Sequence, residues 1–236
     1  MKSILRLILK SEDELLPWIN TTYDHCEDVK NIPVKLFIAI EPYVSDLFNY
    51  SDSYWQLVAN CSDPMLTKFI RKHQHHIIHY IKNNTNPALA DLIIKYCNEK
   101  HESCFSNPNI GLTNYIINSP KSVINYVDLS TNKNPMLTEF IIASYEKLNK
   151  KLLCSNENPA LVELMMIEPH WGKISENPNT GLTEIIINNP DKVDYNRLSY
   201  NTNRKLIPFM YTHAAKLNTL ALISNRAMLR KRSYDL

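Results

Sequence analysis

The sequence has few glycines, no long hydrophobic run and no marked excess of either charge, and each shortage excludes a class of protein. Three glycines in 236 residues form no glycine-rich phosphate-binding loop, so nucleotide binding is not expected. No stretch approaches the about 18 consecutive apolar residues that span a bilayer. The apolar residues 4–9 are interrupted by Arg6, and no small-residue cleavage pattern follows them. We therefore expect neither a signal peptide nor a membrane partner.

Charge and cysteine usage narrow the class further. The 26 basic and 24 acidic residues leave a formal charge of +2, far from the basic excess of a dedicated nucleic-acid-binding protein, so that partner is not expected. The five cysteines are odd in number and widely spread, unlike a disulfide framework, and this favours a reducing, cytoplasmic environment. The 44% hydrophobic content is enough to build a core without disulfides or metals.

What the sequence does contain is an internal repeat. The frame N-x-N-P-x-L occurs at residues 84–89, 132–137 and 156–161, and variants of it fill the intervals. The reference leucines are Leu66, Leu89, Leu112, Leu137, Leu161, Leu182, Leu206 and Leu229, at spacings of 23, 23, 25, 24, 21, 24 and 23 residues. A degenerate earlier unit places Asn31 and Val34 in the same roles. A fixed period of this length is typical of helical repeat proteins.

Each unit predicts one helix that begins just before the leucine. A short polar residue stands three positions before it, where its side chain can cap a helix, and proline follows in four units, as suits a first helical turn. The predicted caps are Asp63, Asn86, Asn109, Asn134, Asn158, Asn179 and Asn203. Large apolar residues three and four positions after the leucine complete an amphipathic stripe.

A second short helix is expected before the next cap. Proline stops the first helix in several units, and an aliphatic residue recurs eight positions before each leucine. The fold class predicted is all-α, an α-solenoid of eight to nine helix-turn-helix repeats of roughly 23 residues. We expect residues 1–58 to form an N-terminal helical cap with the degenerate first repeat, and residues 59–236 to form the repeat array with a C-terminal capping helix.

A second asparagine column stands five positions before the leucine. It comprises Asn84, Asn107, Asn132, Asn156, Asn177 and Asn201. These residues lie outside the helix that the first column caps, so capping does not explain them. We expect stacked turns to bring them into a buried structural ladder that satisfies backbone groups. The alternative is a row of amides that grips an extended peptide or nucleic-acid strand.

Two segments resemble the short NPDK(I/V)DW…LSxNPN repeats of mimivirus-like giant DNA viruses. They are residues 189–203, which read NPDKVDYNRLSYNTN, and residues 119–130, which read SPKSVINYVDLS. The similarity covers roughly residues 60–230, with Arg204 in place of proline and tyrosines in place of tryptophan. The resemblance implies a viral member of a repeat family without assigned chemistry, and it supplies no active site.

Candidate metal ligands are few. His75 and His79 are spaced to share a helical face, but no glutamate of a metalloprotease motif accompanies them, and a polar turn is the alternative. Cys97, His101 and Cys104 have donor types that zinc prefers, yet Cys104 stands in an aliphatic core column. We therefore expect no metal, no cofactor and no catalytic residue.

The candidate partner-binding residues are aromatic. Tyr43, Tyr50, Tyr54 and Trp55 stand in the irregular N-terminal stretch and are of the types that anchor interfaces, with core packing as the alternative. Arg226, Arg230, Lys231 and Arg232 lie near the end of the sequence, where cations interact favourably with the dipole of a last helix, with contact to nucleic acid or an acidic surface as the alternative.

These patterns favour a non-enzymatic binding or scaffold module that presents an extended surface to a protein partner in the cytoplasm. The alternative is a structural component of the virion. A second alternative is a metal-dependent enzyme that uses the histidines from His73 to His79.

Overall fold

The computed structural model describes residues 52–225, which fall into two compact units, residues 52–102 and residues 103–225. The degenerate first repeat, Tyr43, Tyr50, Leu229 and the basic chain end lie outside the described residues. The boundary expected between residues 58 and 59 stays a prediction. The division between the two compact units falls after α7 (Ala90–Lys100), where His101 adopts a left-handed conformation with φ of 54°.

The described residues form helices and turns and contain no strand, so the all-α prediction is confirmed for them. In the first unit the α-helices are α4 (Asp52–Asn60), α5 (Thr67–Lys72), α6 (Gln74–Ile77) and α7 (Ala90–Lys100). The 3-10 turns of this unit are η2 (Pro64–Leu66), η3 (Ile81–Asn83) and η4 (Pro87–Leu89). Among residues 52–225 no helix is both long and apolar enough to cross a bilayer.

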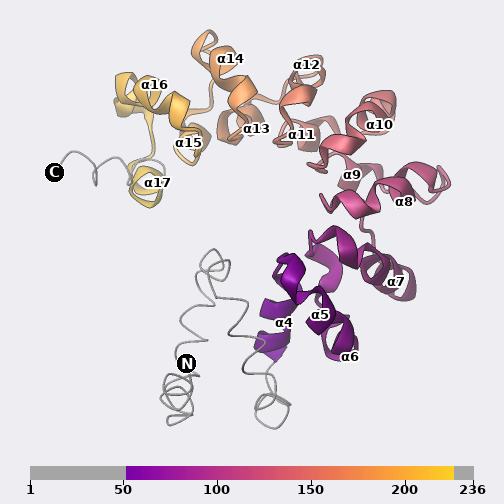
Figure 1. Cartoon of the computed structure of the whole chain (residues 1–236). Coiled ribbons are helices and arrows are strands. Elements are labelled where there is room, and N and C mark those ends of the chain that lie inside the picture. The colour runs from indigo at the N-terminus through magenta and orange to yellow at the C-terminus, as the bar shows by residue number, and fades with distance from the viewer. Residues whose placement is uncertain (1–51, 226–236) are drawn as a thin grey trace, which may run out of the picture. The chain divides into compact units, whose positions relative to one another are not determined.

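The second unit alternates two kinds of helix. The first helix of each repeat is α8 (Thr113–Asn118), α10 (Thr138–Ala143), α12 (Val162–Met165), α14 (Thr183–Ile187) or α16 (Ile207–Thr212). The second is α9 (Tyr126–Leu129), α11 (Lys150–Leu153), α13 (Trp171–Glu176), α15 (Tyr195–Leu198) or α17 (Thr219–Ser224). Within this unit Figure 1 shows the first helices along one side and the second helices along the other.

Every first helix begins as a 3-10 turn and not directly as an α-helix. The turns of the second unit are η5 (Ile110–Leu112), η6 (Pro135–Leu137), η8 (Pro159–Leu161), η9 (Thr180–Leu182) and η10 (Arg204–Leu206). Two further 3-10 turns, η7 (Tyr145–Lys147) and η11 (Ala214–Lys216), precede α11 and α17. In η6 the N–H of Leu137 donates to the carbonyl of Asn134 (3.0 Å), an i to i+3 bond that tightens the start of the helix.

The core consists of the predicted columns. The reference leucines Leu66 to Leu206 all have 0% exposure. The aliphatic position eight residues earlier is buried in every unit, and Cys104, at 1% exposure, occupies it in one of them. Four positions after the leucine the residue is always buried, whereas three positions after it the side chain is only half-buried in α8, α10, α12 and α14. Each repeat therefore buries its leucine against the neighbouring repeats, which one repeat alone cannot do.

Candidate functional site

The first asparagine column caps the 3-10 turns. In η6 the Oδ1 of Asn134 accepts the N–H of Met136 (2.9 Å), and Asp63 and the other five cap residues accept the N–H two positions on in the same way. The Nδ2 of Asn134 donates to the Oγ1 of Thr113 (2.9 Å), which stands one position after the leucine of the previous unit. Thr113 in turn donates to the carbonyl of Ile110 (2.7 Å). The cap thus links consecutive units.

The same cap-to-threonine bond recurs where the threonine is present. The pairs are Asn86 with Thr67 (2.8 Å), Asn158 with Thr138 (2.9 Å) and Asn203 with Thr183 (2.9 Å). In the unit before Asn179 the threonine is replaced by Val162, and the buried Nδ2 of Asn179 finds no partner among the described residues. A Cβ on Gly181 would lie 2.9 Å from Cγ2 of Val162, so glycine allows the two repeats to approach closely there.

The second asparagine column forms a buried ladder. Asn156 has 0% exposure, and its Nδ2 donates to the carbonyls of Ser130 (3.0 Å) and Asn132 (2.9 Å) of the previous unit. Its Oδ1 accepts the N–H of the cap residue Asn158 (2.9 Å). One side chain therefore joins two units and orients the next cap.

The geometry repeats with small variation. Each ladder amide whose donors are described bonds the backbone carbonyl of the previous ladder position and the carbonyl two residues before it. These pairs are Asn84 to Ala59 and Cys61, Asn132 to Phe105 and Asn107, Asn177 to Cys154 and Asn156, and Asn201 to Ser175 and Asn177, at 2.6–3.0 Å. Asn107 accepts the N–H of Asn109 (2.8 Å).

Asparagine suits this position because it carries two donor hydrogens and an acceptor oxygen on a short side chain. Aspartate would have no donor for the two carbonyls, and a buried carbonyl without a partner is costly. The ladder places these amides on backbone groups, so the described contacts give them a structural role rather than a peptide-gripping one.

The sequence analysis missed one member of the ladder, Asn225. Its Nδ2 donates to the carbonyls of Ser199 (2.9 Å) and Asn201 (2.9 Å). It stands four positions before Leu229 and not five, so Leu229 is one residue out of register with the other reference leucines. The repeat spacing could have identified Asn225, because it follows Asn201 by 24 residues.

A second set of caps was also missed, at the start of the second helices. It comprises Asn125, Asn149, His170, Asp194 and Asn218, and each side chain accepts a backbone N–H of the helix that it begins. The first four stand 12 positions before a reference leucine, but their mixed residue types conceal the column. In four-residue helices such as α11 and α15 the cap satisfies a large share of the free N–H groups.

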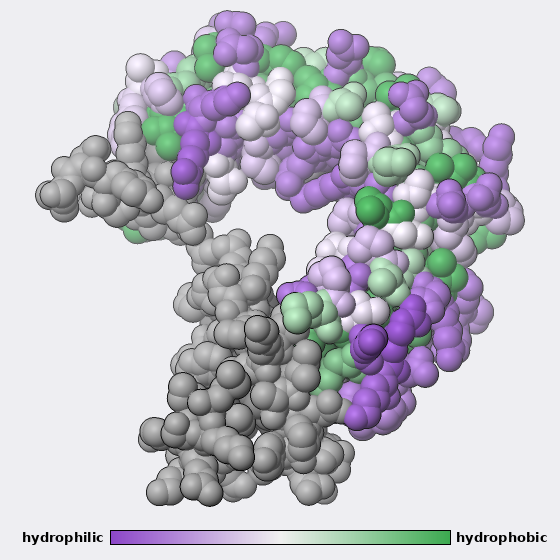
Figure 2. Space-filling view, in the orientation of Figure 1, coloured by the Kyte–Doolittle hydropathy of each residue, from purple (hydrophilic) through white to green (hydrophobic). Residues whose placement is uncertain are grey.

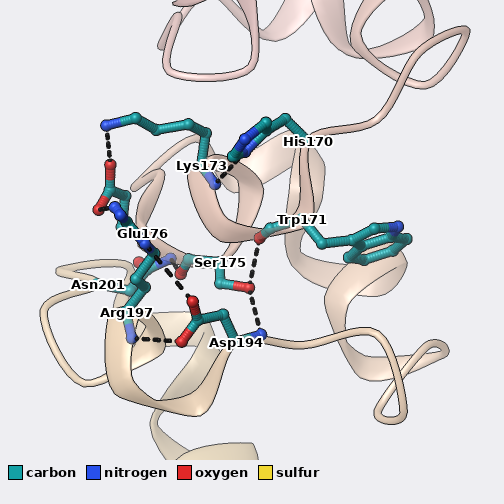
Figure 3. Close-up of polar contacts among 8 residues, drawn as sticks. All are labelled: His170, Trp171, Lys173, Ser175, Glu176, Asp194, Arg197 and Asn201. Atoms are coloured by element: carbon teal, nitrogen blue, oxygen red, sulfur yellow. Dashed lines mark hydrogen bonds and ion pairs between the residues drawn. The ribbon is translucent and has the colours of Figure 1, made fainter. Parts of the chain in front are cut away.

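Serine links these second helices to one another. Figure 3 shows Ser175, whose Oγ donates to the carbonyl of Trp171 (2.7 Å) and accepts the N–H of the next cap, Asp194 (3.0 Å). Ser130 and Ser199 bond Asn149 and Asn218 in the same way (both 2.8 Å). Cys154 takes the serine's place in the intervening unit and accepts the N–H of His170 through its sulfur (3.4 Å).

A lysine from each of three repeats lies over an aromatic ring of the preceding repeat. The contacts are Lys147 over Tyr126 (5.0 Å), Lys192 over Trp171 (5.4 Å) and Lys216 over Tyr195 (4.8 Å). Where Lys150 replaces the aromatic residue, Glu168 replaces the covering lysine. Within the sequence NPDKVDY, Lys192 therefore contacts the preceding repeat, whereas Tyr195 is contacted by the following repeat. Each such cation–π contact is worth about 0.5–1 kcal/mol at an exposed site.

The first helices of the second unit carry a different surface. Glutamate stands two positions after the leucine in α10, α12 and α14, and a large apolar residue stands three positions further on. These residues are Glu139 and Ile142, Glu163 and Met166, and Glu184 and Ile187, and we call them the acidic-apolar face. Figure 2 shows hydrophilic and hydrophobic patches side by side over this side of the second unit. This face is distinct from the buried stripe of the same helices that the repeat predicts.

Of the predicted aromatic anchors, the structure describes Trp55 in full, and it is not a surface anchor. Its side chain is 8% exposed and stacks on His76 with ring centroids 4.6 Å apart. Core packing, the alternative, describes this residue. Tyr54 lies in α4.

The residues considered as candidate metal ligands do not form a cluster in the described part of the chain. His75 lies in α6, which ends at Ile77, and His79 lies in the following turn, so the two do not share one helical face. The ring of His79 meets the edge of Tyr96 (6.5 Å). Cys97 and Cys104 are buried and His101 is exposed. Among residues 52–225 no three side chains of histidine, cysteine, aspartate or glutamate group as metal ligands would.

Comparison of the chain with protein-family models, with curated proteins and with solved structures finds no match. The account of function therefore rests on the geometry above.

Proposed function

We propose that the chain is an α-solenoid scaffold of a giant-virus repeat family that binds a protein partner in the host cytoplasm and performs no catalysis. The observation that supports this is that some positions of the repeat are buried and structural, whereas others are exposed. The asparagines of the ladder are buried and bonded to backbone groups, whereas the residue two positions after the reference leucine is exposed in every described repeat. Such an array holds a row of surface side chains at regular intervals, which is what a binding scaffold needs.

The second compact unit also exposes apolar residues, and these favour a protein-binding role. Ile117, Ile142 and Tyr211, each five positions after a reference leucine, are 40–58% exposed, and Ile167, which follows α12, is 61% exposed. Exposed apolar side chains that gather on one side of a repeat array favour an interaction surface there.

Site-specific photo-crosslinking in infected host cells tests the proposal. The photoreactive residue p-benzoylphenylalanine is placed at Ile142 and Ile187 on the first helices and at Val127 and Leu220 on the second helices. We expect discrete adducts with another protein from at least one side. Absence of adducts from both sides would refute a protein-binding role.

The alternative role, a structural component of the virion, predicts a different location. Mass spectrometry of purified particles would then find the chain at a fixed ratio to the major capsid protein, and the adducts would contain particle proteins only. That result would replace the cytoplasmic role by the structural one.

A further inference from the structure

The acidic-apolar face lies opposite the core side of the first helices. In an α-helix the leucine and the residue four positions later point to one side, and both are buried in α10, α12 and α14. Residues two and five positions after the leucine then point away from the core. Glu139, Glu163 and Glu184 are exposed, Ile142 is 40% exposed, and Met166 and Ile187 are half-buried.

Each glutamate lies one turn before its apolar neighbour, so the two form a pair on the helix surface. The pair repeats in three successive first helices, and the ladder amides Asn156, Asn177 and Asn201 join the units that carry them. The result is a row of carboxylates beside a row of aliphatic side chains, with neighbouring helices about 8–10 Å apart.

The helices that carry these carboxylates contain no basic residue, and the nearest basic residues in the first-helix row are Arg204 and Lys205 of the next turn, η10. None of α8, α10, α12, α14 or the 3-10 turns that precede them contains a lysine or arginine. None of the three glutamates forms an ion pair with any of residues 52–225. Acidic residues elsewhere in the second unit do so, as Glu157 does with Lys133 (2.6 Å) and Glu176 with Lys173 (2.5 Å).

We propose that the acidic-apolar face docks a basic amphipathic helix of a protein partner, whose lysines or arginines meet Glu139, Glu163 and Glu184 while its apolar side covers Ile142, Met166 and Ile187. This inference rests on the proposed function and names the class of partner. The apolar contact supplies affinity and the carboxylates supply orientation and selectivity. Nucleic acid, an acidic peptide and an anionic membrane would each meet like charge on this face.

The test measures binding of a labelled 14-residue probe peptide to the full chain by fluorescence anisotropy. The probe carries leucine at positions i, i+3, i+4 and i+7 and lysine elsewhere, and a second probe carries glutamate in place of lysine. We expect the lysine probe to bind and to weaken as salt is added, because exposed charge pairs are screened. No binding of the lysine probe, or equal binding of the glutamate probe, would overturn the proposal.

Matched variants locate the site. The triple variant Glu139→Lys, Glu163→Lys, Glu184→Lys should weaken lysine-probe binding at least tenfold. The control variant Glu146→Lys, Glu157→Lys, Asp191→Lys changes net charge equally outside the face and should change it less than threefold. Equal losses in the two variants would show non-specific attraction and overturn the proposal.

The apolar half of the face has its own pair of variants. The double variant Ile142→Ser, Ile187→Ser should also weaken binding of the lysine probe at least tenfold, whereas the double variant Val127→Ser, Leu220→Ser should not. Unchanged binding in the first double variant would overturn the proposal.

If sedimentation shows that the chain self-associates and that Ile142→Ser abolishes this, the occupant is a second copy and the proposal is wrong. Crosslinks in cells that arise only from Val127 and Leu220 would refute this inference while leaving the proposed function in place.

Discussion

The buried amide nitrogen of Asn179 has no hydrogen-bond partner among the described residues because Val162 stands where four other repeats place a threonine. In the neighbouring unit Asn158 donates to Thr138 (2.9 Å) through the equivalent atoms. The two sites differ by one hydroxyl, so they form a natural experiment on what the cap-to-threonine bond contributes.

Val162→Thr should stabilise the protein. The hydroxyl replaces a methyl group of similar size and offers an acceptor to the Nδ2 of Asn179, and relief of a buried unsatisfied donor is worth about 1–3 kcal/mol. Chemical denaturation measures the change in the free energy of unfolding. Val162→Ala serves as the control and should destabilise, and a Val162→Thr variant less stable than the wild type would contradict the pairing.

Thr138→Val is the reverse change. It removes the acceptor of Asn158 and should lower the free energy of unfolding by about 1–3 kcal/mol. Thr202→Val, at an exposed residue in a connecting turn, provides the comparison and should have little effect. Equal effects of the two changes would show that the hydroxyl of Thr138 contributes nothing specific.

Leu137→Ala or Leu161→Ala should each lower the free energy of unfolding by about 2–5 kcal/mol, since both side chains have 0% exposure and the change leaves a cavity. Met136→Ala, next to Leu137 but 66% exposed, should stay within about 0.5 kcal/mol of the wild type. An unchanged denaturation midpoint in both leucine variants would refute the repeat register.

The first unit should lose stability in mild acid. Partial burial against Trp55, with the nearby His75 and His73 adding repulsion, lowers the pKa of His76 below its usual 6.5. The unfolded chain therefore takes up the proton first, and the stability present above about pH 6.5 is lost as the pH falls through the lowered pKa.

Denaturation followed by tryptophan fluorescence between pH 7.5 and 5 measures this loss. His76→Phe keeps a ring against Trp55 and should reduce the pH dependence. A variant with the same pH dependence as the wild type would exclude His76 as its origin.

Much of the fold follows from residues whose role is local. Asn134 and the other first-column caps can be read from sequence because a cap needs only its own turn, and Leu137 follows from helical spacing. The ladder was expected as a stack of turns, but its partners, such as Ser130 and Asn132 for Asn156, emerge only when units are placed side by side.

Other features escaped because different residue types perform one task. His170 and Asp194 cap second helices alongside asparagines, and Cys154 accepts the same kind of N–H as Ser175. Trp55 looked like an interface anchor by residue type, and only its stacking on His76 shows that it is buried. The acidic-apolar face was not predicted because the spacing of apolar residues in a helix identifies its buried side and leaves the residues of the exposed side unconstrained.

The central claim is that the asparagine ladder holds the units together while the exposed faces bind. The most direct test is the free energy of unfolding of Asn156→Ala beside Asn196→Ala, which makes the same change at an exposed position of α15. Asn156→Ala leaves the carbonyls of Ser130 and Asn132 and the N–H of Asn158 without their partner, so a loss of about 1–3 kcal/mol or more is predicted, with little change for Asn196→Ala. An Asn156→Ala variant that keeps full stability but loses partner binding would contradict the claim and make the ladder the binding site.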